Sequence, residues 1–300
     1  MPTDGRTDRS PWTVLKALQW TADYFKQKGL DTFRTDAETL LAHALHCQRI
    51  DLYLHHDQPL NEDERARFKE LIQRRIRHEP VAYIVGAKEF WSLPLRVTPA
   101  VLIPRPDTEC LVETALKHLP LGASVQGTDI LELGVGSGAV LVALAHERPE
   151  CRCLASDCSW PAIQLARDNA RQNGVADKIH FFMGRWMAAL RPWPGLFDMV
   201  LSNPPYIRSG DIGRLAPEIR LFEPVGALDG GPDGLAHITT IIAEAHRHLK
   251  PNGLLLLEIG FDQRDAVQAL ARQWDAYEPI TFHKDYAGHA RVAQLRKKGS

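Results

Sequence analysis

Four consecutive residues, Asn203, Pro204, Pro205 and Tyr206, follow an apolar segment and could bind a planar NH2 group. Proline fixes φ and lacks an amide hydrogen, so carbonyl oxygens in this segment stay available as acceptors. The side-chain oxygen of Asn203 and the carbonyl of Pro204 could accept both hydrogens of one NH2 group, while Tyr206 covers its flat face. Such acceptors would make the nitrogen more tetrahedral and aim its lone pair at an electrophilic carbon. The segment therefore predicts a catalytic and substrate-binding loop for reaction at a planar nitrogen.

A glycine-rich turn provides a candidate nucleotide site. The apolar segment 129–133 runs into Gly134, Val135 and Gly136, and a helix is expected from Gly138 onwards. Glycines at such a turn let a ligand approach main-chain atoms closely. The spacing also fits a dinucleotide fingerprint, in which a helix N-terminus binds a pyrophosphate, so the turn alone leaves the cofactor open.

Three more side chains bear on the choice of cofactor. Asp157 ends the next predicted strand, about 20 residues after the glycines, where a carboxylate could accept hydrogen bonds from ribose hydroxyls or cap the following helix. Glu132 could face the cationic methionine part of S-adenosylmethionine, whereas it would repel a pyrophosphate. Trp186 could stack on adenine or belong to the core. The cofactor-binding candidates are Glu132, Leu133, Gly134, Val135, Gly136, Asp157, Trp186 and Asn203.

The elements that must position these residues alternate between strand and helix after residue 127. Strands are predicted at residues 129–133, 152–156, 179–183, 197–202 and 254–259, with helices from Gly138, Trp160 and Gly234 and over residues 262–274. Such alternation predicts a parallel sheet covered by helices on both faces, and residues 279–283 and 291–295 should add an antiparallel hairpin. The predicted fold class is α/β, a Rossmann-like methyltransferase sheet with an antiparallel C-terminal hairpin. Ligands bind beyond the carboxyl ends of strands in such sheets, which would place the glycine turn beside Asn203.

The segment before this sheet is predicted to be helical. The predicted helix starts are Ser10 before Pro11, Thr35 with Glu38 in a capping box, and Asn61 with Glu64 in another. Residues 82–85 and 95–97 are predicted as short strands of a hairpin, and a helix is expected at residues 108–118. These patterns divide the chain into a small helical domain at 1–80, a β-hairpin linker at 81–101 and a catalytic domain at 102–300.

The bulk composition narrows the class of protein. Lysine plus arginine number 36 and aspartate plus glutamate 37, so the total charge gives no drive toward nucleic acid. No run approaches about 18 uninterrupted apolar residues, and residues 1–10 lack the apolar stretch of a signal peptide.

Five cysteines without a disulfide framework are typical of a reducing compartment, so we expect a cytoplasmic protein. Cys151 and Cys153 should face the core, and with Cys158 they lack zinc-finger spacing, so no metal site is predicted.

The helix that starts at Asn61 is rich in basic residues. They are Arg65, Arg67, Lys69, Arg74, Arg75 and Arg77. Acidic residues lie among them, which favours a solvated face. The alternative is a face that meets an acidic patch on a protein partner.

Taken together, the motifs resemble those of the bacterial release factor glutamine methyltransferases. The similarity covers nearly the whole chain and includes residues 79–86, 89–90, 102–109, the glycine turn, Asn203 to Tyr206, and residues 222–224, 233–235 and 284–288. The resemblance implies transfer of a methyl group from S-adenosylmethionine to the glutamine of a Gly-Gly-Gln motif in class-1 peptide chain release factors. It also implies that the glutamine is held at residues 203–206 and that the helical domain docks the release factor. We expect a monomeric enzyme that needs neither nucleic acid nor a membrane.

The residues alone leave other acceptors and another reaction open. The NH2 groups of adenine and cytosine present the same two hydrogens to Asn203, although a base methyltransferase usually needs a basic surface and room for a flipped base. A glutamine of a ribosomal protein is a second alternative acceptor. A nicotinamide-dependent dehydrogenase would explain the glycine turn and Asp157 but leaves Glu132 and residues 203–206 without a role. A binding protein without activity is the last alternative.

Overall fold

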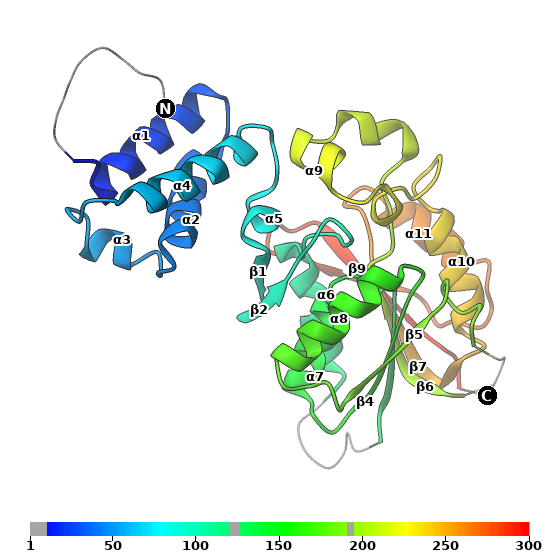
Figure 1. Ribbon diagram of the computed structural model, residues 1–300. Coiled ribbons are helices and arrows are strands. Elements are labelled where there is room, and N and C mark those ends of the chain that lie inside the picture. The colour runs from blue at the N-terminus through cyan, green and yellow to red at the C-terminus, as the bar shows by residue number, and fades with distance from the viewer. Residues whose placement is uncertain (1–10, 120–126, 191–194, 300) are drawn as a thin grey trace. The chain divides into compact units, whose positions relative to one another are not determined.

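The computed structural model describes residues 11–119, 127–190 and 195–299 (Figure 1). These residues form two compact units. The first, here called the helical unit, comprises the chain up to Gly86 together with Pro217–Phe222. The second, called the sheet unit, comprises Ala87–Ala216 and the chain from Glu223 onwards. Each unit has hydrophobic clusters of its own.

The helical unit packs short amphipathic helices around one core. Its helices are α1 (Val14–Gln27), α2 (Phe33–Leu45), α3 (Asp51–Leu54), α4 (Glu62–Arg75), α5 (Val81–Val85) and α9 (Pro217–Phe222). Phe25 from α1, Leu41 from α2 and Phe68 from α4 are buried at its centre. Burial of this shared apolar face, rather than helix propensity, holds such short helices in place.

Two predicted helix starts have different outcomes. The capping box at the start of α4 is confirmed: the Asn61 side chain accepts from the Glu64 N–H, and the Glu64 carboxylate accepts from the Asn61 N–H, both at 2.9 Å. α1 begins at Val14, later than predicted, and its cap is Thr13. The predicted cap Ser10 lies outside the described residues.

The capping box predicted at Thr35 is wrong. α2 already begins at Phe33, so Thr35 lies inside the helix, and Glu38 is buried instead of completing a cap. The Glu38 carboxylate accepts hydrogen bonds from the side chains of Arg34, Arg49 and Tyr53. These donors compensate the charge that burial would otherwise penalise.

The strand predicted at residues 82–85 is also wrong, because these residues belong to α5. A run of five apolar residues is too short for its periodicity to separate a strand from a buried helical turn. The hairpin follows, with β1 (Ala87–Phe90) paired antiparallel to β2 (Leu93–Arg96). Trp91 and Ser92 form its two-residue turn with φ values of 53° and 58°, the sign that a type I′ turn requires.

The sheet unit contains a seven-stranded sheet in the order β5-β4-β3-β6-β7-β9-β8. Its strands are β3 (Asp129–Leu133), β4 (Arg152–Asp157), β5 (Ile179–Met183), β6 (Phe197–Ser202), β7 (Leu249–Glu258), β8 (Thr281–Lys284) and β9 (Ala290–Arg296). Its helices are α6 (Glu109–Lys117), α7 (Ala139–Glu147), α8 (Trp160–Gln172), α10 (Ala236–Ala245) and α11 (Arg264–Ala271), with 3-10 turns at Pro106–Thr108, Ser209–Arg214 and Val225–Ala227. Strands β3 to β7 pair in parallel, and β8 and β9 are antiparallel, as predicted.

Helices cover both faces of this sheet. Ile130 and Leu254 belong to a cluster with residues of α6, α7 and α8. Leu131 and Leu255, one position further along the same strands, belong to a second cluster with residues of α10 and α11. Figure 1 shows α7 and α8 on one side of the strands and α10 and α11 on the other. Because successive residues of a strand face opposite sides, burial of both sides explains the nearly continuous apolar runs.

The strand order reverses between β3 and β6, which lie side by side at the centre of the sheet. The two strands are parallel, so their carboxyl ends meet at one edge. The Ser202 hydroxyl donates to the Leu133 carbonyl at 2.8 Å and ties these ends together. Ligands of open parallel sheets bind at such a switch point. The glycine turn after β3 and Asn203 after β6 therefore start from adjacent positions.

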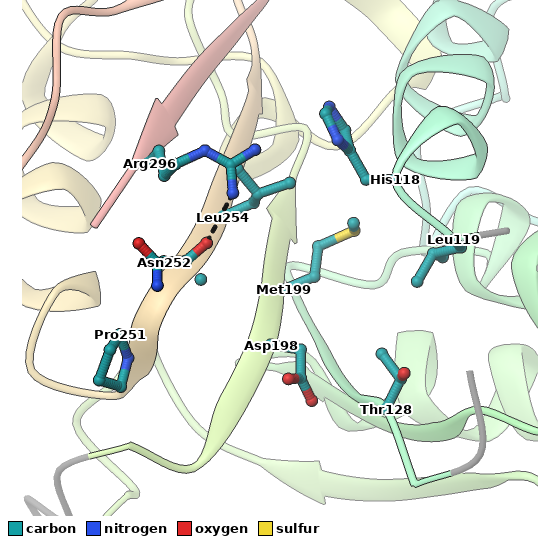
Figure 2. A pocket seen from close by; sticks show the side chains of 10 residues that line it. His118, Leu119, Thr128, Asp198, Met199, Pro251, Asn252, Leu254 and Arg296 are labelled. Carbon is teal, nitrogen blue, oxygen red and sulfur yellow. Dashed lines mark hydrogen bonds between the residues drawn. The ribbon is translucent and has the colours of Figure 1, made fainter. Parts of the chain in front are cut away.

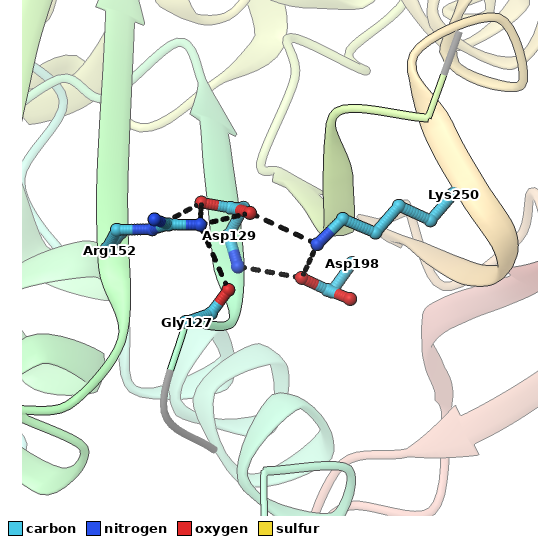
Figure 3. A network of polar contacts seen from close by, with 5 residues as sticks. All are labelled: Gly127, Asp129, Arg152, Asp198 and Lys250. Carbon is cyan, nitrogen blue, oxygen red and sulfur yellow. Dashed lines mark hydrogen bonds and ion pairs between the residues drawn. The ribbon is translucent and has the colours of Figure 1, made fainter.

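Ion pairs brace the opposite edge of the sheet (Figure 3). The Lys250 ammonium lies 2.6 Å from Asp198 and 3.1 Å from Asp129, at the amino ends of β6 and β3. Arg152, at the start of β4, pairs with Asp129 at 2.7 Å. These contacts link neighbouring strands and satisfy both carboxylates, so this edge is held by charge pairing.

Candidate active site

The glycine turn joins β3 to α7 and is bonded to the neighbouring strand. The N–H groups of Gly134 and Val135 both donate to the Ser156 carbonyl of β4, at 2.8 and 2.9 Å. Gly134 has φ +72°, a backbone conformation that side chains disfavour. A Cβ atom at this position would also lie 3.4 Å from the Trp186 ring. A glycine therefore keeps both the turn and the space next to the tryptophan.

Glu132 places a buried carboxylate directly before this turn. One of its oxygens accepts from the Leu141 N–H at 3.1 Å. Burial raises the pKa of Glu132 well above its usual range, and the nearby charge of Asp157 adds to the rise. Within residues 11–119, 127–190 and 195–299, no basic side chain pairs with it. Such a carboxylate would attract a cationic ligand and would repel a pyrophosphate.

Asp157 fastens the same turn from the end of β4. Its Oδ2 accepts from the Gly136 N–H at 3.0 Å, and its Oδ1 accepts from the Ser159 N–H at 2.8 Å. The residue that caps α8 is Ser159, whose hydroxyl accepts from the Ala162 N–H, so the alternative role of Asp157 as the helix cap is wrong. Each carboxylate oxygen can accept a further hydrogen bond, which leaves capacity for ribose hydroxyls.

Trp186 lies beside the turn in a strained backbone conformation. Its φ of +50° is uncommon for a residue other than glycine, and such strain concentrates at functional sites. Its ring lies next to Gly134 and 5.2 Å from the ring of His237, at an interplanar angle of 51°. The indole is partly buried and packs against the core, so a flat base would meet only part of it. His237 was not foreseen from the sequence.

Asn203 follows β6 with its amide held at one end. Its Nδ2 donates to the Thr108 hydroxyl at 3.2 Å. Among the residues that the structure describes, no hydrogen bond occupies Asn203 Oδ1 or the Pro204 carbonyl. Pro204 and Pro205 are buried, whereas Asn203 is partly accessible. The loop thus presents two unoccupied acceptors in adjacent residues.

Tyr206 is fixed at its hydroxyl and at its backbone. The hydroxyl donates to Glu258 Oε1 at 3.2 Å, and the Gln263 side-chain amide donates to the Tyr206 carbonyl at 3.0 Å. Burial and the adjacent Glu258 raise the pKa of Tyr206, so it stays a neutral donor. Gly234 packs against the same carbonyl, because a Cβ there would come within 2.5 Å of it.

Sequence reasoning missed several residues that build this site. They are Thr108, Glu223, His237, Glu258 and Gln263. Glu223 is buried, accepts from the Ile103 N–H at 3.2 Å and pairs with Arg105. A signal existed for some of them: Thr108 and Glu223 lie in segments of the family resemblance, and Glu258 is a charge at the end of an apolar strand.

No group of three or more His, Cys, Asp or Glu side chains among the described residues could hold a metal ion, and none of their helices is long and apolar enough to cross a membrane. Cys151 and Cys153 are buried, as predicted, and Cys158 is exposed.

A cavity of about 310 Å³ lies at the opposite edge of the sheet. Figure 2 shows His118, Asp198, Met199 and Arg296 around it. Asp198 and Met199 belong to the first half of β6, whereas Asn203 follows the end of that strand. The cavity therefore does not belong to this site.

Comparisons with known proteins identify the family of this chain. Residues 16–86 match the family model of the PrmC N-terminal domain, and residues 108–219 match that of the methyltransferase small domain. A release factor glutamine methyltransferase from Rhodopirellula baltica is 38% identical over 289 residues, 96% of this chain and 97% of its own. Another, from Geobacter sulfurreducens, is 42% identical over 256 residues, 85% of this chain and 87% of its own. The chain belongs to the release factor glutamine methyltransferase family.

A solved structure supports the fold of this family member. The structure of a methyltransferase from Pyrococcus furiosus matches with a TM-score of 0.52 and 19% identity, over 76% of this chain and 99% of its own. The fold predicted from the alternation of strands and helices, with its helical N-terminal domain, is confirmed.

Proposed function

We propose that this chain transfers a methyl group from S-adenosylmethionine to the side-chain amide nitrogen, N5, of the glutamine in the Gly-Gly-Gln motif of class-1 peptide chain release factors. The family supports the reaction and the class of substrate. The observation that carries the proposal is the pair of unoccupied acceptors, Asn203 Oδ1 and the Pro204 carbonyl, after β6 and next to the end of β3.

The residues after β3 and β4 fit S-adenosylmethionine better than a dinucleotide. Glu132 is a buried carboxylate suited to the ammonium and sulfonium of the methionine part. Asp157 has acceptor capacity for the ribose hydroxyls, and Trp186 offers part of an aromatic face to adenine. Gly134 and Gly136 leave the backbone open to close approach. When bound, S-adenosylmethionine supplies an electrophilic methyl carbon.

The acceptor loop prepares the amide nitrogen for this carbon. A glutamine NH2 group has a delocalised lone pair and is a poor nucleophile. Asn203 Oδ1 and the Pro204 carbonyl would hold its two hydrogens and favour a tetrahedral nitrogen, an interaction that strengthens toward the transition state. Tyr206, held by Glu258 and Gln263, would cover the flat face of the amide. The methylated nitrogen loses its proton readily to water, so no strong base is required.

The helical unit is proposed to dock the release factor, as the substrate-docking domain at residues 1–80. Its family match, to the PrmC N-terminal domain, covers residues 16–86 and separates this chain from methyltransferases that lack such a domain. Docking at a second surface would supply binding energy that orients the glutamine for in-line transfer.

Methyl transfer to a panel of acceptors tests the proposal. Labelled S-adenosylmethionine is offered with a class-1 release factor, with its glutamine-to-alanine variant, with a ribosomal protein and with DNA. We expect label only on the unaltered release factor. The variant Asn203→Ala should transfer at least about a hundredfold more slowly, since it removes an acceptor used in the transition state.

The same panel can reject the proposal. Label on the glutamine-to-alanine release factor, on the ribosomal protein or on DNA at a comparable rate would show a different acceptor. Binding of S-adenosylhomocysteine, measured by calorimetry on the Asn203→Ala protein, controls for loss of the cofactor site.

A further inference from the structure

Gln263 lies outside the loop proposed to bind the substrate amide but is bonded to that loop. It is 3% exposed and directly precedes α11. Its Oε1 accepts from the Gly260 N–H at 2.9 Å, and because an N–H can only donate, this bond fixes the direction of the side-chain amide. Its Nε2 donates to the carbonyls of Tyr206 and Gly234, both at 3.0 Å. Both hydrogens of this NH2 group are therefore used inside the protein.

The acceptor loop, residues 203–206, has few groups with which it can be held in place. Pro204 and Pro205 have no N–H groups to donate. The Pro204 carbonyl and Asn203 Oδ1 must stay unoccupied if they are to accept the hydrogens of a substrate NH2 group. The orientation of the loop must therefore be fixed from its two ends.

Both ends of the acceptor loop are anchored within the sheet unit. At the first end, β6 pairs with β3 and β7, and Asn203 Nδ2 donates to the Thr108 hydroxyl at 3.2 Å. At the second end, the side-chain amide of Gln263 holds the Tyr206 carbonyl. The ring of Pro205 fixes φ between these ends, so a displacement of the Tyr206 carbonyl would also move the acceptor carbonyl that precedes it.

The backbone around Tyr206 is packed too closely to accommodate another side chain. A Cβ atom on Gly234 would lie 2.5 Å from the Tyr206 carbonyl oxygen and 2.8 Å from Gln263 Nε2. A Cβ atom on Gly230 would lie 2.8 Å from Tyr206 Cα. The Gly230 N–H also donates to the Ile207 carbonyl at 2.8 Å. The Gln263 amide thus bonds the place at which two closely packed segments meet.

We infer that Gln263 is a positioning residue for methyl transfer, because its amide fixes the Tyr206 carbonyl and with it the orientation of the acceptor loop. This inference rests on the proposed function, because it takes residues 203–206 as the loop that binds the substrate amide. An acceptor misplaced by about 1 Å can lower the rate about a hundredfold, since the nitrogen no longer lines up with the methyl carbon. Loss of the Gln263 amide should therefore lower kcat and leave the binding of cofactor and release factor unchanged.

Steady-state kinetics of two variants over about pH 5.5–9 test this inference. Gln263→Met removes both donors. Gln263→Glu keeps the acceptor for the Gly260 N–H but turns a second acceptor toward two carbonyl oxygens, until a proton bound by the carboxyl group restores one donor. Both variants should lower kcat about tenfold or more at the upper end of this range, with little change in KM for the release factor. Relative to the unaltered protein, Gln263→Glu should recover as the pH falls, and Gln263→Met should not.

The surroundings of position 263 favour the protonated form of the carboxyl group in Gln263→Glu. The site is buried and faces two carbonyl oxygens. The charged groups on the surrounding elements are Glu258 at the end of β7, Asp262 with its partner Arg208 at 2.7 Å, and Asp233. Three of these four groups are carboxylates, which also favour a neutral neighbour. Gln268→Glu introduces the same charge in the middle of α11 and is the control, which should keep the kcat and pH profile of the unaltered protein.

The outcomes separate the inference from the proposed function. Full activity of Asn203→Ala would remove the acceptor itself, and with it the proposed function. If Asn203→Ala is inactive while Gln263→Met keeps the kcat of the unaltered protein, only the inference fails. Equal loss of kcat in Gln263→Met and Gln263→Glu at every pH would mean a packing role and would also overturn it. So would a weaker affinity of either variant for S-adenosylhomocysteine in calorimetry, because Gln263 would then act on the cofactor site.

Discussion

At the scale of single residues, Glu132 and Glu258 are buried carboxylates with raised pKa values at the ends of β3 and β7. Among the described residues, neither carboxylate lies within ion-pair distance of a basic side chain. Burial favours the neutral form of an acid. Each of these carboxylates therefore ionises only when a ligand or a hydrogen-bond donor stabilises its negative charge. A measurement of the protonation of each carboxylate therefore tests its role.

Proton release on cofactor binding should report the role of Glu132. A cation beside the carboxylate lowers its pKa, so binding of S-adenosylhomocysteine, which retains the ammonium group, should release protons and tighten as the pH rises. Glu132→Gln should bind about tenfold more weakly at high pH and release fewer protons. Calorimetry in two buffers of different ionisation enthalpy measures this. Equal proton release by both proteins would contradict the assignment.

The pH dependence of the free energy of unfolding should reflect the raised pKa of Glu258. Its pKa rises from 4.5 in the unfolded chain to about 7 in the folded protein, so its stabilising contribution is full below pH 4.5 and is lost as the pH rises through about 7. Relative to Glu258→Gln, the unaltered protein should lose up to about 3 kcal/mol of unfolding free energy across that window, at about 1.4 kcal/mol per pKa unit. Urea titrations of both proteins at several pH values measure it. A difference that does not change with pH would refute the raised pKa.

At the scale of elements, a comparison of two glycines separates the effect of a side chain beside Trp186 from the effect of backbone strain. Gly134 and Gly174 have nearly the same φ, +72° and +71°, but only Gly134 lies against Trp186. Alanine at either position should cost roughly 1–2 kcal/mol of stability. Only Gly134→Ala should also weaken the binding of S-adenosylhomocysteine, by about tenfold or more. Equal binding by the two variants, measured by calorimetry, would mean that the turn does not contact the cofactor.

Elements with a continuous apolar pattern could be predicted from the sequence, and elements with an irregular pattern could not. The bounds predicted for β3, β5 and β6 match the structure. β7 begins at Leu249, five residues earlier than predicted, because Pro251 and Gly253 have the composition of a turn although the strand continues through them. The 3-10 turns between residues 203 and 236 carry no periodic pattern to detect.

The candidate site was predictable only where its residues are neighbours in sequence. The glycine turn and residues 203–206 are contiguous motifs. Thr108 and Glu258 lie 95 and 52 residues from their partners Asn203 and Tyr206, and only the folded sheet brings them together. A sequence pattern cannot reveal a contact between residues that lie so far apart along the chain.

At the scale of the whole molecule, the helical unit gathers segments that are distant in sequence. α9 belongs to it although its sequence neighbours belong to the sheet unit. Arg75, at the end of α4, is buried and bonds Asp36 at 2.7 Å and Glu218 of α9 at 2.9 Å. The expectation that Arg75 lies on a solvated basic face is therefore wrong, because two carboxylates compensate its burial. Lys69 and Arg77, by contrast, are exposed.

Those exposed charges offer a test of docking by the helical unit. If they meet an acidic surface, the double variant Lys69→Glu with Arg77→Glu should raise KM for whole release factor several-fold and leave the rate on a short glutamine peptide unchanged. Glu70→Lys, a reversal of the opposite sign at an exposed position of α4, is the control and should not raise KM. An equal effect of the double variant on both substrates would reject a docking role for this face.

The central claim, methylation of a glutamine amide nitrogen, is tested most directly on the labelled product. Release factor methylated by this protein is digested, and tandem mass spectrometry locates the added methyl group. Acid hydrolysis of the same peptide then shows which atom carries it, because an N-methyl amide releases the label as methylamine. We predict one methyl group on the glutamine of the Gly-Gly-Gln motif and label recovered as methylamine. A methyl group on another residue, or label that is not released as methylamine, would contradict the account.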